Sequence, residues 1–283
     1  IADGSIYETK EWDDFVIKNP EYVGDTERKL AIALPGEGLV YDYYFDCKTA
    51  KYTNWLSDAP PFKIERDAKF NSILVPTIDT IRNEWLLETM LRKGFHVLCT
   101  GDTGTGKSVT IKSKLLSGMP DNFTAPISLN FSAQTSANQT QDLIDSKLDK
   151  RRKGVIGPPL GQTTIVFVDD LNMPAKEIFG AQPPIEILRQ WMDHRGWYDR
   201  KENEFRRLVD IQFCAAMGPP GGGRTRITQR YVRHFNLINF VNFSDESLAR
   251  VFTTILDWKL AQGFANPVKQ LSGAVVDATI SVY

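Results

Sequence analysis

The sequence is poor in the residues that build metal clusters and disulfide frameworks, and it has no long hydrophobic run. It contains 3 cysteines and 3 histidines in 283 residues, and their wide spacing excludes a Cys-x-x-Cys pair or a Cys/His ligand set. No apolar stretch approaches the ~20 residues that cross a bilayer, and no signal-peptide pattern opens the chain. The net charge of −1 gives no overall attraction to polyanions. We therefore expect no nucleic-acid partner and no membrane partner.

The rest of the composition is that of an ordinary globular protein. Apolar residues make up 42% of the chain and charged residues 24%, which is a usual balance. The length allows one large domain with an appendage, or two domains. Cys99 and Cys214 lie in apolar runs, which predicts two small buried hydrophobes in a reducing compartment. Because the chain begins at Ile1 rather than Met, we interpret it as a piece of a longer polypeptide.

One eight-residue segment carries the clearest chemistry. Residues 101–108 read Gly-Asp-Thr-Gly-Thr-Gly-Lys-Ser, a complete phosphate loop between an apolar run and a helical pattern. The glycines let backbone N–H groups point at a triphosphate, Lys107 reaches the outer phosphates, and Ser108 ligates Mg²⁺. The alternative is a glycine-rich turn that precedes a lysine. The residues expected to bind the nucleotide here are Gly101, Thr103, Gly104, Thr105, Gly106, Lys107, Ser108 and Val109.

A second signature follows about sixty residues later. Residues 164–170 read Thr-Ile-Val-Phe-Val-Asp-Asp, so an apolar strand delivers two carboxylates at its C-terminal end, where open α/β sheets bind ligands. We expect Asp169 to hold Mg²⁺, usually through water, and Asp170 to be the catalytic base or water-positioning group. The alternative is a pair of acidic residues that begin a solvated loop.

Other polar segments are open to two interpretations. The glycine-rich 218–224 loop is either a tight or mobile loop beside the phosphates or a flexible surface loop. Arg230 and Arg233 either project toward a neighbour's γ-phosphate or form surface salt bridges. The basic run 150–153 is a solvated loop or contacts an acidic neighbouring surface. Asn130 is a candidate partner for the catalytic carboxylate.

Apolar runs alternate with helical patterns from residue 71 onward, which predicts a parallel α/β sheet with helices on both faces. The expected strands are Phe95–Thr100, Ile127–Phe131, Thr163–Val168, Leu208–Met217 and Asn236–Val241. The expected helices are Thr80–Lys93, Lys107–Leu116, Ser136–Leu148, Pro184–Met192 and Asp245–Leu260. We also expect a β-rich run at Leu39–Phe45, a hairpin or loop at Lys150–Gly161 and a strand-like tail at Val275–Tyr283.

The same patterns predict three parts. Residues 1–70 are rich in Tyr, Trp, Asp and Pro and carry no phosphate signature, so we expect an extension that docks on the main domain. Residues 71–243 form the large α/β part. Residues 244–283 begin with a serine-capped helix.

Together these motifs resemble the AAA+ ATPases, and longer segments look like the third AAA+ module of an axonemal dynein heavy chain. The segments that carry this resemblance are 74–82, 130–136, 150–154, 169–174, 180–184 and 215–224. Upstream, residues 38–43 and Trp55 look like the connector from the second module. The resemblance implies an AAA+ P-loop fold with an N-terminal extension and a truncated, incomplete helical subdomain.

The resemblance also implies a function. Dynein is a ring motor of six modules that moves toward microtubule minus ends in cilia or flagella, and its third module is a regulatory site for ATP or ADP with Mg²⁺. Adenine is then expected near Val75, Pro76 and Ile78, and Arg230 and Arg233 act in trans on the preceding module. The implied partners are neighbouring AAA+ modules, with intermediate chains, light chains and microtubules bound by other parts. The implied location is the cytoplasm and cytoskeleton, in the axoneme.

Three positions depart from the family pattern. Asp170 stands where AAA+ ATPases usually have Glu, and Gly218 where many have a polar residue such as Asn. Asp102 replaces a common Pro, and its carboxylate should turn away from the phosphates because like charges repel. We therefore expect a regulatory module with slow or weak hydrolysis. The alternatives are a competent ATPase with Asp170 as base, or a scaffold that binds nucleotide without hydrolysing it.

Overall fold

The computed structural model describes residues 35–36, 38–57, 59, 62–70 and 73–282. About half of the expected extension, residues 1–34, lies outside the described residues, as does the last residue of the expected tail. The chain divides into two compact units, residues 1–82 with 244–283, and residues 83–243. Each is described by itself.

The second unit is built on a five-stranded parallel sheet, in the order β11-β3-β10-β7-β4. Its strands are β3 (Val97–Gly101), β4 (Ile127–Asn130), β7 (Thr164–Asp169), β10 (Ile211–Met217) and β11 (Asn236–Phe240). The predicted α/β fold with a parallel sheet is confirmed, with strand ends shifted by up to three residues. The register pairs Val97 with Cys214 and Ile211 with Thr164.

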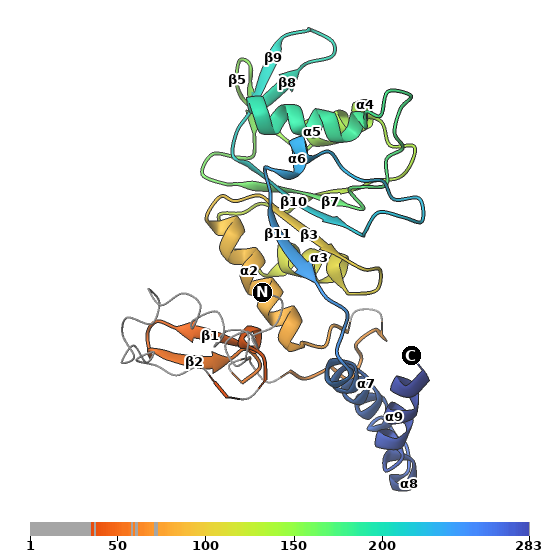
Figure 1. Ribbon diagram of the computed structural model, residues 1–283. Coiled ribbons are helices and arrows are strands. Elements are labelled where there is room, and N and C mark those ends of the chain that lie inside the picture. The colour runs from red at the N-terminus through yellow and green to blue at the C-terminus, as the bar shows by residue number, and fades with distance from the viewer. Residues whose placement is uncertain (1–34, 37, 58, 60–61, 71–72, 283) are drawn as a thin grey trace, which may run out of the picture. The chain divides into compact units, whose positions relative to one another are not determined.

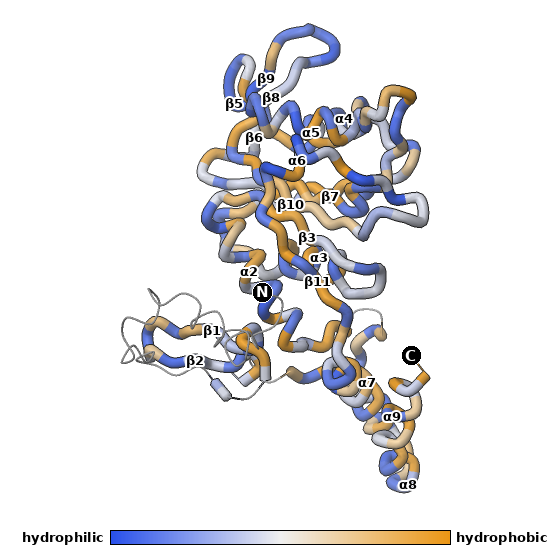
Figure 2. The backbone as a smooth tube through the Cα atoms, viewed as in Figure 1, coloured by the Kyte–Doolittle hydropathy of each residue, from blue (hydrophilic) through white to orange (hydrophobic). Residues whose placement is uncertain are grey.

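Helices cover both faces of this sheet because its strands are apolar on both sides. Leu98 and Val166 point into one core, while the next residues along each strand point into the other. The helices are α2 (Ile78–Arg92), α3 (Lys107–Ser117), α4 (Ala137–Asp145), α5 (Pro183–His194) and α6 (Gln229–Val232). The α4, α5 and α6 side chains fill the first core, and those of α2 and α3 the second. Figure 1 shows these two layers, and Figure 2 shows the hydrophobic strands between them.

A second sheet was not predicted as such. Its four strands run in the order β5-β6-β9-β8. They are β5 (Asp149–Arg152), β6 (Val155–Gly157), β8 (Gly196–Tyr198) and β9 (Phe205–Leu208). The expected hairpin at 150–161 is β5–β6. The expected strand from Leu208 was wrong at its start, because the backbone turns at Asp210 with φ 54°. Leu208 therefore ends β9, and β10 begins at Ile211.

The described residues of the first unit include a short hairpin and the helices that follow residue 244. The expected β-rich run at 39–45 is a 3-10 turn, η3 (Val40–Asp42), followed by β1 (Tyr43–Asp46), which pairs with β2 (Lys51–Asn54). The predicted helix at 245–260 is confirmed as α7 (Asp245–Leu260), capped by the Ser244 hydroxyl. After it come α8 (Asn266–Lys269) and α9 (Ser272–Val282).

The expected strand-like tail was wrong, because residues 272–282 are helical. Ser272 and Val276 are buried and Ile280 is half-buried, so the inward positions recur every four residues, as on one face of a helix. The β-branched residues of this segment had favoured a strand. Among the described residues, no helix is long and apolar enough to span a membrane.

Candidate functional site

Three loops meet at one edge of the five-stranded sheet. Because β10 lies between β3 and β7, the loops that follow these parallel strands emerge side by side at their carboxyl ends. A cavity of about 370 Å³ opens there. Its lining comes from the phosphate loop, the Asp-Asp pair and the glycine-rich loop: Thr103, Gly104, Gly106, Lys107, Ser108, Val109, Asp169, Asp170, Ala216, Met217, Gly218 and Arg224.

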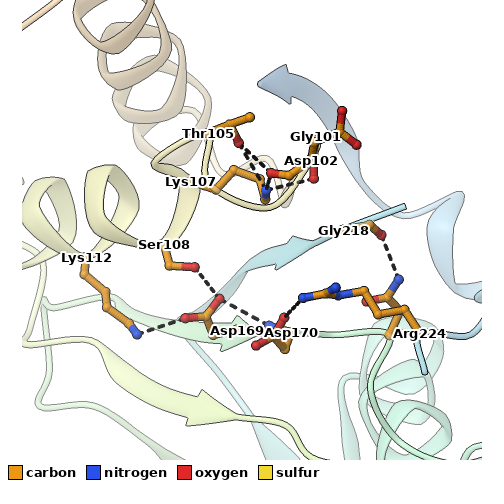
Figure 3. Close-up of polar contacts among 11 residues, drawn as sticks. Gly101, Asp102, Thr105, Lys107, Ser108, Lys112, Asp169, Asp170, Gly218 and Arg224 are labelled. Atoms are coloured by element: carbon orange, nitrogen blue, oxygen red, sulfur yellow. Dashed lines mark hydrogen bonds and ion pairs between the residues drawn. The ribbon is translucent and has the colours of Figure 1, made fainter. Parts of the chain in front are cut away.

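The phosphate loop is a closed curl around the Lys107 side chain. The Nζ atom of Lys107 donates to the Gly101 carbonyl at 2.8 Å, to the Thr105 hydroxyl at 3.1 Å and to the Asp102 carbonyl (Figure 3). Gly106, with φ 75°, precedes α3 and offers no capping side chain. The first N–H groups of α3 therefore face the loop uncapped, which is the arrangement that binds anions.

Glycine at position 101 is required by packing. A Cβ atom there would lie 2.2 Å from the Phe240 carbonyl oxygen, a distance that no side chain can tolerate. The neighbouring strand β11 thus presses against the start of the loop. Asp102, the unusual acidic residue, is exposed, and only its carbonyl contacts Lys107.

Asp169 lies at the centre of a short polar chain. Its Oδ1 accepts from the Ser108 hydroxyl at 2.6 Å, and its Oδ2 accepts from Lys112 Nζ at 2.9 Å (Figure 3). A hydroxyl and a carboxylate are oxygen ligands of the kind that Mg²⁺ prefers, with water and phosphate oxygens completing its shell. These residues fit Mg²⁺ held with a nucleotide. Within the described residues, no group of three or more His, Cys, Asp or Glu side chains is placed to hold a metal ion.

Asp170 lies beside Asp169 but points to the opposite side of the site. Its backbone is left-handed, with φ 52°, a conformation that Asp tolerates better than most residues. Its N–H donates to Asp169 Oδ1 at 3.2 Å. Its own carboxylate pairs with Arg224 at 3.4 Å between Oδ1 and Nη2.

Two cations share the cavity. Partial burial lowers the pKa of Lys107, and the positive charge of Arg224 lowers it further, while Asp102, Asp170 and Asp169 act in the opposite direction. The cavity is also lined by the carboxylates of Asp169 and Asp170, so an anionic ligand is favoured on the side of Lys107 and the uncapped N-terminus of α3.

The remaining predicted residues lie away from this cavity or in the other unit. Arg230 lies on α6, is exposed, and forms no ion pair with any residue that the structure describes. Arg233 is also exposed but pairs with Asp193 at 3.0 Å. Asn130 is exposed at the end of β4, in register with Asp169. Val75, Pro76 and Ile78 belong to the first unit, and their role toward adenine stays a prediction.

Sequence reasoning missed three residues at this edge. Lys112 contacts Asp169, Arg224 contacts Asp170, and the buried Asn172 donates to the Gly218 carbonyl at 2.8 Å. Lys112 had a signal, since it lies one helical turn after Ser108 and shares its face of α3. Arg224 belongs to the glycine-rich loop that one interpretation placed beside the phosphates, but its contact with Asp170 and the contact of Asn172 had no signal, because they join segments far apart in the sequence.

The basic run 150–153 and the two cysteines contribute to the fold and do not line the cavity. Arg151 lies inward and contacts Asp210, while Lys150, Arg152 and Lys153 are exposed. Cys99 and Cys214 are buried and unbridged, which confirms the expected small apolar packing. The hydrogen bond with Cys99, and then burial, hold the pKa of Cys214 well above its usual value.

Comparison with known proteins agrees with this geometry. Residues 62–243 match the family model described as P-loop containing dynein motor region. The chain is 47% identical to mouse dynein axonemal heavy chain 1, and the match covers 90% of this chain and 7% of that protein. It is 46% identical to mouse dynein axonemal heavy chain 3, covering 88% of this chain and 6% of the relative. It is 45% identical to rat dynein axonemal heavy chain 12, covering 87% and 8%.

The chain spans less than a tenth of the length of these relatives. The family match covers more than half of the chain, including the phosphate loop, the Asp-Asp strand and the glycine-rich loop. The chain therefore belongs to the P-loop-containing dynein motor regions, as an AAA+ module like those of axonemal dynein heavy chains.

Proposed function

We propose that this chain is the third AAA+ module of a ciliary or flagellar dynein, and that it binds ATP or ADP with Mg²⁺ to regulate the motor. The observation that carries the proposal is the contact between the Ser108 hydroxyl and Asp169 Oδ1 at 2.6 Å. It joins the phosphate loop to the Asp-Asp strand, so the two groups that hold Mg²⁺ in such sites already meet. Magnesium supplies neutralisation of phosphate charge when it is bound.

The residues of the proposed nucleotide site have separate tasks. The α3 N-terminus and Lys107 bind the phosphates, and Ser108 with Asp169 hold the metal. Lys112, 2.9 Å from Asp169, fixes the orientation of that carboxylate. Asp170 orients the attacking water. Val75, Pro76 and Ile78 are the proposed contacts of adenine.

The proposed regulatory role rests on Asp170 and Gly218. The Asp170 carboxylate is one methylene shorter than that of Glu, so it reaches an attacking water less well. Gly218 has no side chain that could orient water beside the γ-phosphate. Slow or weak hydrolysis follows, because both features reduce positioning of the attacking group.

We further propose that the chain acts beside other AAA+ modules of the same heavy chain. Arg230 is exposed and free of ion pairs with the described residues, so it is the better of the two arginines for reaching a neighbour's γ-phosphate. In this proposal residues 1–70 connect from the preceding module and residues 244–283 begin the helical subdomain. Intermediate chains, light chains and microtubules bind elsewhere on the motor, which moves toward microtubule minus ends in the axoneme.

Calorimetric titration of this chain with MgATP and MgADP tests the proposal. We expect binding of both nucleotides, and single-turnover hydrolysis that is slow. A fast turnover that Asp170→Asn abolishes would instead identify a competent ATPase with Asp170 as its base. Binding without any turnover would favour a nucleotide-stabilised scaffold. Absence of binding to either nucleotide would refute all three readings.

A further inference from the structure

The loop that follows β10 returns an arginine to the nucleotide cavity. Arg224 and Gly221 exchange two backbone hydrogen bonds, of 2.9 and 3.0 Å, which close residues 221–224 into a tight turn. The Thr225 N–H donates to the Asn172 carbonyl at 2.9 Å and fixes the end of the turn. The loop is therefore anchored at its base, and Arg224 is directed back over the end of β10 rather than into solvent.

The glycine at position 218 leaves the space that Arg224 occupies. A Cβ atom on Gly218 would lie 3.0 Å from Arg224 Nε and 3.1 Å from Arg224 Cδ. Any larger side chain would have to displace the arginine. Gly218 has no side chain with which to sense phosphate, and the same lack of a side chain leaves room for the Arg224 cation.

The hydrogen bonds of Arg224 are incomplete. Its Nη2 is 3.4 Å from Asp170 Oδ1, which is longer than the ~2.7–2.9 Å of a strong charge-assisted pair. Its Nε is buried and has no hydrogen-bond partner among the described residues. A guanidinium has five N–H donors in a planar fork that suits phosphate oxygens, so Arg224 retains capacity for an anionic ligand.

The surroundings favour such a ligand on this side of the cavity. Arg224 and Asp170 meet across the site from Lys107 and Lys112 (Figure 3). The Asp169 carboxylate is already engaged by Lys112, whereas the Asp170 side chain is 49% exposed and holds Arg224 by one long contact. A phosphate group with two negative charges would compete well for this guanidinium.

We propose that Arg224 is a phosphate-sensing residue acting in cis, which exchanges Asp170 for the terminal phosphate of a bound nucleoside triphosphate. This inference rests on the proposed nucleotide site and deepens it. The exchange lets the module distinguish ATP from ADP and releases the Asp170 carboxylate only when a third phosphate is present. Arg224 therefore takes over the sensing task that Gly218 cannot perform.

The test measures affinity for a non-hydrolysable ATP analogue and for ADP, each with Mg²⁺, in Arg224→Ala and Arg224→Lys. We expect Arg224→Ala to weaken the triphosphate about 10- to 100-fold, the worth of a charged hydrogen bond, and ADP by less than about threefold. Arg224→Lys keeps the charge but not the fork, so its loss should be intermediate. Arg226→Ala, an exposed arginine two residues on, is the matched control and should change neither affinity.

A second variant keeps the test usable if Arg224→Ala fails to fold. Asp170→Asn removes the competing carboxylate, so triphosphate affinity should rise several-fold over ADP in the unmodified background and not in Arg224→Ala. Equal losses for both nucleotides in Arg224→Ala, or no change, would overturn the inference. If Lys107→Ala weakens the triphosphate while Arg224→Ala does not, the nucleotide site stands and only the sensing role falls. If the unmodified chain binds neither nucleotide, both fall.

Discussion

Buried polar groups differ in their hydrogen-bond partners between two regions of the molecule. One is the carboxyl edge of the five-stranded sheet, and the other is the four-stranded sheet with its helices. In the four-stranded sheet and its helices, polar groups are closely partnered: Trp197 Nε1 donates to Asp145 at 3.0 Å, and Gln141 Nε2 to the Tyr198 carbonyl at 2.7 Å. At the carboxyl edge, Arg224 Nε and Asn172 Oδ1 are buried without a partner among the described residues. The two donors named in the four-stranded sheet and its helices are partnered, whereas these two atoms at the carboxyl edge are not.

This difference separates residues that stabilise the fold from residues that await a ligand. An unpaired buried polar group costs about 1–3 kcal/mol, and a fold keeps such a group where another function compensates. We call the four-stranded sheet with its helices the closed region, and the carboxyl edge of the five-stranded sheet the open edge. Polar groups of the closed region should therefore govern unfolding, and those of the open edge should govern nucleotide binding. Variants in each region test this contrast.

The largest effect is expected from the closed region. Trp191 is 1% exposed, its Nε1 donates to the Leu208 carbonyl at 3.1 Å, and its ring centroid is 4.9 Å from that of Phe213. Trp191→Ala should lower the free energy of unfolding by about 3–5 kcal/mol, as measured by urea denaturation. Leu116→Ala, at a position 71% exposed, is the control and should have little effect. A loss below about 1 kcal/mol for Trp191→Ala would contradict the assignment.

The next effect belongs to the open edge. Lys107→Ala should weaken triphosphate binding about 100-fold, because it removes a charged donor to the phosphates. Stability should change by less than about 1 kcal/mol, since partial burial and the charge of Arg224 already disfavour the lysine cation. Titration calorimetry and urea denaturation measure the two quantities. Lys153→Ala, an exposed lysine of the β5–β6 hairpin, is the control. Unchanged nucleotide affinity would show that the loop does not bind phosphate.

Acid should act through His96, which precedes β3 and lies against Trp191 with the ring centroids 5.6 Å apart. Burial, then the nearby charges of Arg195 and His234, lowers the pKa of His96 to about 4, and its Nδ1 accepts from the Phe213 N–H at 3.0 Å. Because the folded pKa lies below the unfolded one, this stability is present above about pH 6.5 and is lost as pH falls toward 4. The loss between pH 7 and pH 5 should be about 2 kcal/mol.

Denaturation series at these two pH values check the effect of acid. His96→Gln retains an acceptor but cannot titrate, so its stability should fall less between pH 7 and pH 5. His194→Gln, at an exposed position, should keep the full pH dependence. An identical slope in all three proteins would show that His96 does not carry it.

The main sheet could be predicted from the sequence because its strands are almost wholly apolar. A run such as Thr164–Val168 has no solvent-facing side, and only a sheet covered on both faces accommodates it. The phosphate loop and the Asp-Asp pair were equally readable, because their chemistry lies in adjacent residues. The meeting of these motifs followed from the rule that parallel strands present their carboxyl ends at one edge.

The parts that could not be predicted depend on contacts between distant residues. β8 has three residues and β9 reads Phe-Arg-Arg-Leu, so neither has the length or alternation of a strand. Val275 and Val276 favoured a strand in the tail, but packing of one face every four residues made it a helix. Arg224 meets Asp170 across 54 residues, and no local pattern indicates such a pair.

The smallest expected effect distinguishes the two arginines near α6. Arg233 pairs with Asp193 at 3.0 Å, but its side chain is 64% exposed, and Asp193 is also held by Arg189 at 2.8 Å. Arg233→Ala should therefore cost no more than about 1 kcal/mol, the usual range for an exposed ion pair, and 0.5 M salt should reduce that cost. Arg230→Ala should cost nothing measurable by urea denaturation, since this residue has no ion pair within the described part of the chain. If Arg230→Ala destabilises the chain as much as Arg233→Ala does, the Arg230 charge stabilises the folded chain. Its proposed role toward a neighbouring module would then lose its structural basis.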